Sequence, residues 1–134
     1  MTEPTLPHDA QAESDVLAAI LSPTGSSWGV VAAVSEILAR PAMFFVAGHR
    51  RIYEAVLACY ERQGLTDAAA VAEELDRQGY LETVGGREKL AALALAAGGE
   101  VVQDRLLERA RVVRLCAVLR DCIAAGQQVA ALGW

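Results

Sequence analysis

The chain is poor in aromatic side chains. Phenylalanine, tryptophan and tyrosine make up 5% of its 134 residues, whereas 54% of the residues are hydrophobic and many of these are alanine. A core of small side chains favours closely packed helices over a sheet sandwich, whose strands are enriched in aromatic and β-branched residues. A chain of this length forms one ordinary domain with a sizeable core. The composition therefore predicts a single all-α domain.

Lysine is almost missing, and this excludes a nucleotide-driven motor within these residues. Such motors hold the triphosphate in a loop of the form GxxxxGK[ST], where backbone N–H groups and a lysine neutralise the phosphates. The single lysine, Lys89, follows Glu88 and precedes Leu90, so the sequence contains no such loop. We predict that this chain is not an ATP-hydrolysing enzyme.

Basic residues are too few for a typical nucleic-acid-binding domain. Twelve lysines and arginines stand against 17 aspartates and glutamates, which gives a net charge of -5. A domain that grips phosphate backbones by itself usually has a basic face. Although a local basic stripe is compatible with an acidic total, the charge argues against direct nucleic-acid binding. It favours a protein that binds other proteins.

The sequence also lacks targeting and membrane-spanning segments. No apolar run approaches the ~20 residues that cross a bilayer, and the start, MTEPTLPHDAQAES, has neither the basic nor the apolar region of a signal peptide. The cysteines, Cys59, Cys116 and Cys122, are odd in number and lie in apolar helical sequence, which indicates buried reduced thiols. We expect a cytoplasmic protein without membrane association.

No group of residues has the spacing of a catalytic or metal site. The sequence contains no GxSxG turn, and its cysteines and histidines are not spaced as zinc ligands. His49 beside Arg50 would suit a general base next to an anion-binding side chain. We favour instead a structural role in which one ring nitrogen of His49 forms a hydrogen bond within the protein. The acidic pair Glu73-Glu74 is typical of a solvated helix face. We predict no catalytic residue, no cofactor and no metal ion in this chain.

Apolar residues recur with helical spacing between glycine and proline breaks. Met43, Phe44 and Phe45 are expected to fill the core, and Gly85-Gly86 to allow a tight reversal of the backbone. The expected helices run from an Asp9 cap to about Leu21, from a Ser27 cap to about Ala39, from about Ala47 to Gln63 before Gly64, from Thr66 or Asp67 to Gly79, from Arg87 to about Ala97 before Gly98-Gly99, and from Glu100 to about Leu132.

The last expected helix is longer than a small head can cover. It contains no proline and one glycine, Gly126, near which a bend is possible. Its apolar residues continue beyond the reach of the shorter helices, which implies a partner surface formed with another copy, a following helix, or both. We predict that the self-association surface consists of Leu106, Ala110, Val113 and Ala117.

Several motifs resemble the N-terminal domain of the DnaB family of replicative DNA helicases. The resemblance covers nearly the whole chain, and Arg109 to Ile123 resembles the start of the helical hairpin that follows the family's head. The motifs are Leu6-Pro7, Ala12-Glu13, Val16-Leu17 and Ile20-Leu21, then Phe44 or Phe45 with His49-Arg50, Ile52-Tyr53 and Ala55, and finally Val71-Ala72-Glu73-Glu74-Leu75 with Leu81, Val84-Gly85-Gly86 and Leu90.

The resemblance implies a compact six-helix head followed by a long C-terminal helix that begins a hairpin arm. We accordingly divide the chain into a mobile N-terminus at 1–10, a helical head at 11–99 and the first half of the arm at 100–134. The second half of the hairpin would lie beyond Trp134. The family's ATPase domain, which binds ATP and Mg²⁺, is absent from these residues.

The function implied by the resemblance is a collar that assembles with other copies and docks primase and loader proteins in DNA replication. The alternative is a stand-alone helical adaptor or decoy without a motor, either of phage type or similar to the helicase-binding region of primase. Tyr53 also fits a half-buried core position. The positions that match the family pattern are His49, Arg50, Ile52, Tyr53, Glu54, Gly85 and Gly86.

Overall fold

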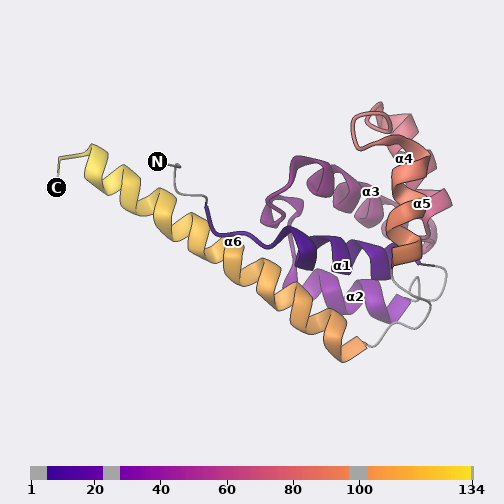
Figure 1. Cartoon of the computed structure of the whole chain (residues 1–134), viewed down its shortest axis with the longest axis horizontal. Coiled ribbons are helices and arrows are strands. Elements are labelled where there is room, and N and C mark those ends of the chain that lie inside the picture. The colour runs from indigo at the N-terminus through magenta and orange to yellow at the C-terminus, as the bar shows by residue number, and fades with distance from the viewer. Residues whose placement is uncertain (1–5, 23–27, 97–102, 134) are drawn as a thin grey trace.

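The computed structural model describes residues 6–22, 28–96 and 103–133. Within these ranges the chain forms α-helices and one short 3-10 helix and contains no strand, so the predicted all-α class is confirmed (Figure 1). Six helical elements precede the long last helix. The elements are α1 (Ala10–Leu21), α2 (Trp28–Ile37), η1 (Pro41–Met43), α3 (Ala47–Gln63), α4 (Ala68–Gln78), α5 (Gly86–Ala96) and α6 (Gln103–Ala131).

Helix α1 lies at the centre of the head, in contact with α3, α5 and α6 (Figure 1). Asp9 caps it as predicted, because its carboxylate accepts a hydrogen bond of 2.9 Å from the Ala12 N–H. The predicted apolar stripe is fully buried: Val16, Leu17, Ile20 and Leu21 have no exposed surface. A helix surrounded on several sides is the structural centre of a small core.

Helix α3 joins α2 to the core through Tyr53. This side chain is fully buried beside Phe44, with the two ring centroids 4.9 Å apart, and its hydroxyl donates a 2.7 Å hydrogen bond to the Leu38 carbonyl. Burial raises the pKa of the Tyr53 hydroxyl, so the group remains a hydrogen-bond donor. Tyr53 is therefore a full core residue and not a half-buried one, and Phe44 fills the core as predicted.

Several predicted helix ends are confirmed. Helices α3 and α4 stop at Gly64 and Gly79, both in the left-handed region. The N-cap of α4 is Asp67, while Thr66 is buried and its hydroxyl lies 3.5 Å from the Ile20 carbonyl. The predicted Ser27 cap and the Gly98-Gly99 break lie outside the described residues.

Helix α6 contributes its first half to the head, which corrects the predicted self-association surface. Leu106, Ala110, Val113 and Ala117 are all buried within the chain, on a helix that packs against α1 and α2. The predicted boundary between head and arm at residue 100 therefore does not follow the packing. The prediction was wrong because helical spacing reveals an apolar face without saying what covers it.

The second half of α6 extends beyond the other helices (Figure 1). The helix is continuous to Ala131, so it has no break at Gly126. Exposed apolar side chains lie along this half, among them Val118, Leu119, Ile123 and Val129. In the described part of the chain, no helix is long and apolar enough to span a membrane.

The N-terminal segment is held in place from Pro7 onward, which corrects part of the predicted mobile region. The Pro7 carbonyl accepts a 2.8 Å hydrogen bond from Arg120, and the His8 ring stacks on Phe45 with centroids 4.2 Å apart. Asp9 forms the α1 cap. Residues 1–5 of the predicted mobile region lie outside the described residues.

Two predictions of side-chain exposure were wrong. Only Cys59 is buried, whereas Cys116 is half-buried and Cys122 is exposed; all three are free thiols. Glu73 is exposed as expected, but its neighbour Glu74 is buried and accepts hydrogen bonds of 2.8 Å from Arg62 and 3.0 Å from Gln78. Gln78 lies four residues away on the same helix, but Arg62 on α3 is 12 residues away in sequence, so local spacing could not identify it.

The predicted reversal at Gly85-Gly86 depends on left-handed backbone angles. Their φ values are 109° and 78°, in a region that side-chain-bearing residues rarely adopt. A Cβ atom added at Gly85 would lie 2.8 Å from the Lys89 Cβ, whereas one added at Gly48 would meet nothing within 4 Å. Both backbone angle and space therefore require glycine at position 85.

Replacing Gly85 by alanine should reduce the free energy of unfolding by about 1 to 3 kcal/mol, because the substitution combines an unfavourable φ with a close contact. Chemical denaturation monitored by circular dichroism measures this change. The matched control is Gly48→Ala in the first turn of α3, where the free energy should stay the same or rise by up to about 1 kcal/mol. Equal stability of Gly85→Ala and the parent would show that the turn tolerates a side chain.

Candidate functional site

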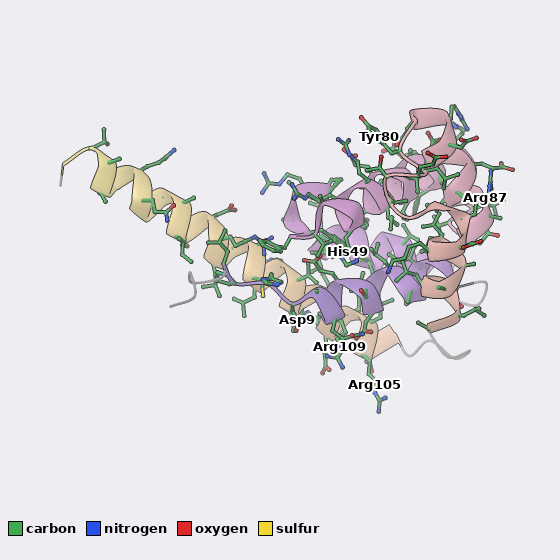
Figure 2. All side chains as sticks on the ribbon, turned by 45° about the horizontal axis from the view of Figure 1, so that its top comes forward. Asp9, His49, Tyr80, Arg87, Arg105 and Arg109 are labelled. Atoms are coloured by element: carbon green, nitrogen blue, oxygen red, sulfur yellow. The ribbon has the colours of Figure 1, made fainter. Side chains whose placement is uncertain are left out.

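A buried carboxylate joins the beginning of the chain to the start of α3. Glu13 of α1 accepts hydrogen bonds from the Phe45 N–H at 2.7 Å and the Val46 N–H at 3.2 Å. Its Oε1 also lies 2.8 Å from Nδ1 of His49. Glu13 is 1% exposed and His49 is 8% exposed, so these contacts are shielded from water. Figure 2 shows His49 inside the head, above α1.

At the start of α3, the Glu13 carboxylate provides a hydrogen-bond acceptor that the N-cap residue lacks. The N-cap residue of α3 is Val46, whose side chain cannot accept a hydrogen bond. The first N–H groups of a helix have no partner within the helix, and the N-terminus carries a partial positive charge. The Glu13 carboxylate places its negative charge at this end of α3 and accepts from the two N–H groups, Phe45 and Val46, that directly precede the helix. The contact thereby orients α3 relative to α1.

The same hydrogen bonds determine the charge state of Glu13. Burial by itself would raise the pKa of this carboxyl, but the hydrogen bonds from His49, Phe45 N–H and Val46 N–H together outweigh burial and lower the pKa. An ionised carboxylate only accepts, so Nδ1 of His49 is the donor. His49 is thus satisfied internally, and the structural alternative predicted for it is confirmed.

The position of Glu13 in the sequence indicates its buried role. Glu13 precedes Val16 and Leu17 by three and four residues, so it lies on the apolar face of α1. A charge on an apolar helix face has to be paired inside the protein. The partner, however, lies more than 30 residues away in sequence, so periodicity alone could not name it.

Arg120 forms a second junction, between α6 and the rest of the head. Its guanidinium donates hydrogen bonds of 2.8 Å to the Pro7 carbonyl and 2.8 Å to the Met43 carbonyl. It also lies 5.3 Å from the centre of the Phe45 ring, and this ring stacks on His8. Three separate segments therefore meet at Arg120. The junction fixes α6 at the point where its exposed half begins.

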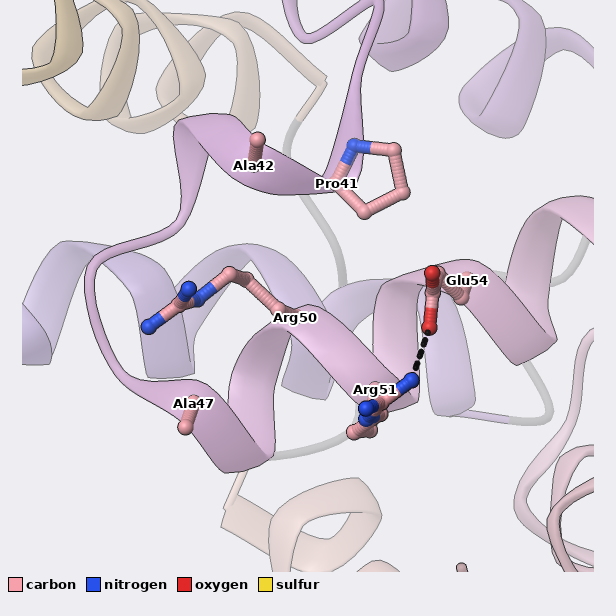
Figure 3. A pocket seen from close by; sticks show the side chains of 6 residues that line it. All are labelled: Pro41, Ala42, Ala47, Arg50, Arg51 and Glu54. Atoms are coloured by element: carbon pink, nitrogen blue, oxygen red, sulfur yellow. Dashed lines mark hydrogen bonds and ion pairs between the residues drawn. The ribbon is translucent and has the colours of Figure 1, made fainter.

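An open hollow lies between η1 and α3, with a volume of about 280 Å³. Figure 3 shows Pro41 and Ala42 on one side and the first turns of α3 on the other. Arg50 donates a 3.1 Å hydrogen bond to the Phe45 carbonyl. We call this site the η1–α3 hollow; its lining residues are Pro41, Ala42, Ala47, Arg50, Arg51 and Glu54.

The structure separates the family-pattern positions into three groups. Ile52 and Tyr53 belong to the core with buried His49, whereas Arg50 and Glu54 are exposed in the η1–α3 hollow. Gly85 and Gly86 shape the turn before α5, and Arg87, directly after them, lies far from His49 in Figure 2. These positions do not form one site. Among the described residues, no three His, Cys, Asp or Glu side chains gather as metal ligands.

Helix α6 presents an apolar row on the side opposite its buried face. The spacing alternates between three and four residues, so the row follows the 3.5-residue repeat of helices that pair along their length. Gly126 continues the same spacing. We call this row the outer seam of α6; it consists of the exposed residues Val112, Leu115, Leu119, Cys122 and Val129.

Replacing Glu13 by glutamine should lower the free energy of unfolding by about 2 kcal/mol or more, because two N–H groups and His49 lose their charged acceptor. Thermal and chemical denaturation measure this loss. The control is Asp15→Asn, which removes the partly exposed ion pair between Asp15 and Arg109, whose charged atoms are 3.6 Å apart. This control should change the free energy of unfolding by about 0.5 kcal/mol or less. A glutamine variant as stable as this control would contradict the central role of Glu13.

The stability of the head should also depend on Glu13 as the pH falls. The pKa of Glu13 is lowered below its ordinary value of 4.5 in the folded state, so its stabilising contribution is complete above that value. The contribution is lost as the pH falls through the lowered pKa. Denaturation between about pH 6 and about pH 3 should therefore show a steeper loss of stability for the parent than for Glu13→Gln. Parallel curves would exclude this linkage.

Comparison with known proteins relates the chain to one family. The family described as "DnaB-like helicase N terminal domain" matches residues 5–109. The chain is 31% identical over 136 residues to "Replicative DNA helicase DnaB" of Leifsonia xyli subsp. xyli, covering 98% of this chain and 27% of the relative. It is 34% identical over 132 residues to the protein of that name from Mycobacterium leprae, covering 96% of this chain and 20% of the relative.

A solved structure shares both the fold and the sequence pattern. The crystal structure of the N-terminal domain of DnaB helicase from Mycobacterium tuberculosis matches with a TM-score of 0.83 and 34% identity, over 96% of this chain and 88% of that one. The chain thus spans 27% and 20% of the length of these two relatives but 88% of the solved domain. On these grounds the chain belongs to the family of DnaB-like helicase N-terminal domains.

Proposed function

We propose that this chain is the N-terminal collar of a replicative DNA helicase and that it assembles with other copies through the outer seam of α6. In this proposal it acts in DNA replication in the cytoplasm. The observation that carries the proposal is the outer seam, an apolar row on the outward side of α6 that continues into the half extending beyond the head.

The position of the outer seam favours pairing with another helix. The buried face of α6 already contacts α1 and α2, so the outer seam is not needed for the core of the head. Leu115 is 59% exposed and Val129 is 50% exposed. Contiguous apolar surface of this kind is typical of a protein contact, and its 3.5-residue repeat matches a helical partner.

The motor function belongs, in this proposal, to another part of the protein. The relatives are named replicative DNA helicases, and the aligned region is 27% and 20% of their length. ATP and Mg²⁺ would bind in the remaining part, because the residues of this chain do not fit a triphosphate. Its one lysine, Lys89, lies within α5 and follows the Gly85-Gly86 turn without a phosphate-binding loop.

Docking of primase and of a helicase loader is the second part of the proposed role. It is supported by the family membership and by the acidic net charge of -5, which favours binding to proteins over binding to nucleic acid. The docking function requires protein surfaces on the head that remain accessible after assembly. The η1–α3 hollow is such a surface on the described part of the head, because its lining residues come from η1 and α3 and not from the outer seam.

Replacing Leu115 and Leu119 by aspartate should abolish self-association while leaving the head folded, because both side chains are exposed in the isolated chain and would carry a charge into an apolar contact. The measurement is light scattering after size exclusion over a concentration series. A second series contains the C-terminal domain of the cognate primase, which should form a complex with the parent chain.

Two controls make the experiment specific. Leu65→Asp with Leu95→Asp also replaces exposed leucines, but these lie outside α6 and should not alter self-association. Leu106→Asp instead should unfold the head, because Leu106 is buried. A parent chain that stays monomeric and ignores primase would overturn the collar proposal and favour an adaptor for another protein.

A further inference from the structure

We propose that the η1–α3 hollow is a docking site for an acidic segment of a protein partner, whose carboxylates bind Arg50 and Arg51 at separate points. This inference rests on the proposed docking function and specifies the chemistry of the partner. Its basis is the combination of an open hollow, a small apolar lining, and two arginines whose guanidinium groups extend from α3 in different directions (Figure 3).

The shape of the hollow follows from its small side chains. Pro41 and Ala42 of η1 face the first turns of α3, where Ala47 leaves space above the backbone. Arg50 and Glu54 lie three and seven residues after Ala47, so all three are on the same side of α3. The volume of about 280 Å³ accommodates a side chain of a partner together with its neighbouring backbone. Proline and alanine provide apolar contact without filling the space.

Arg51 is held ready to bind a carboxylate. Its guanidinium lies 4.0 Å from the centre of the Tyr80 ring and donates a 3.2 Å hydrogen bond to Glu54. Contacts on two sides restrict the rotamers of this long side chain, so less conformational entropy is lost when a ligand binds. The side chain remains 42% exposed, which keeps it accessible.

Arg50 provides the second donor. One of its terminal nitrogens donates to the Phe45 carbonyl at 3.1 Å, and the side chain is exposed. Guanidinium groups present several N–H donors in a planar fork that matches the two oxygens of a carboxylate. Two separate guanidinium groups beside an apolar wall therefore suit a segment that carries more than one carboxylate with apolar residues between them.

Glu54 shows how this site accommodates a carboxylate. Its Oε2 accepts a hydrogen bond from Arg51 in the structure without a ligand, and its side chain is 45% exposed. The pair lies at the surface, where such ion pairs contribute little to stability. An incoming carboxylate can therefore replace Glu54 as the acceptor at small cost. Glu54 thus acts as an internal competitor for the ligand.

The charge around η1 favours an acidic ligand in an otherwise acidic protein. A smaller hollow of about 120 Å³ lies on the other side of Ala42 and includes Arg40, Arg120 and Asp121. The two hollows together are lined by four arginines and two carboxylates, a local excess of two positive charges within a chain of net charge -5. Local charge of the opposite sign attracts and orients an acidic partner.

A peptide fits this surface better than a nucleic-acid strand. Half of the lining of the η1–α3 hollow is apolar, from Pro41, Ala42 and Ala47, and this suits an apolar side chain beside the carboxylate. A phosphate backbone would bring a row of negative charges along a protein that is itself acidic. We therefore commit to an acidic segment with interspersed apolar residues.

The test uses a short rhodamine-labelled peptide that alternates aspartate with leucine, titrated with the full chain and followed by fluorescence anisotropy. A peptide with asparagine in place of aspartate and a labelled oligothymidylate are the comparison probes. The double variant Arg50→Gln with Arg51→Gln should bind the aspartate peptide about tenfold more weakly or worse, because it loses charged hydrogen bonds. Glu54→Gln should bind it more tightly, because the internal competitor is removed.

The matched control is Arg87→Gln with Arg105→Gln, which removes the same charge from exposed positions elsewhere and should leave binding unchanged. The proposal is overturned if the aspartate peptide does not bind, if the asparagine peptide binds equally well, or if the control weakens binding as much as the double variant. Tighter binding of oligothymidylate through Arg50 and Arg51 would identify a nucleic-acid site and also overturn it.

Self-association separates this proposal from the collar function. The Arg50→Gln, Arg51→Gln variant should assemble like the parent in light scattering, because neither residue belongs to the outer seam of α6. Loss of peptide binding with normal assembly supports the hollow as a docking site. Normal peptide binding in a chain that never self-associates would refute the collar function and leave the hollow as a docking site.

Discussion

The buried carboxylate of Glu13 is the interaction on which the arrangement of the head depends. It accepts hydrogen bonds from the Phe45 and Val46 N–H groups just before α3 and from Nδ1 of His49, and it belongs to the central helix of the core. A charge in such a position is stable only when every oxygen has a donor, and here the donors come from one short stretch of chain. The contact joins two motifs that lie far apart in the sequence, Ala12-Glu13 and His49-Arg50.

The rest of the molecule is arranged around this junction. Tyr53 follows His49 by one turn of α3 and attaches the end of α2, while Phe45, whose N–H binds Glu13, also stacks on His8 and lies near Arg120. The core, the N-terminal segment and α6 are thus connected through a few residues. The two surfaces proposed for partners, the outer seam of α6 and the η1–α3 hollow, lie on different elements.

Local signals in the sequence predicted the helices well, whereas contacts between distant residues escaped prediction. Asp9 and Gly64 mark helix ends through their own chemistry, so α1 and α3 begin and end close to the predicted positions. Glu13 and Glu74 are buried by partners on other helices, which no local spacing identifies. Helix α6 has two apolar rows, and the sequence could not tell that Leu106 and Val113 face the head while Leu115 and Leu119 face outward.

Helix α6 is a single rigid element that is shared between the core and the outer seam. The helix is unbroken from Gln103 to Ala131, so its exposed half has no flexible connection to the part buried under α1 and α2. At about 1.5 Å per residue, the portion beyond Ala117 is about 20 Å long, and a tilt of about 10° at the head would move its end by about 3 Å. A small repacking inside the head is therefore transmitted along the whole helix, and in the proposed assembly it would change the position of a neighbouring copy.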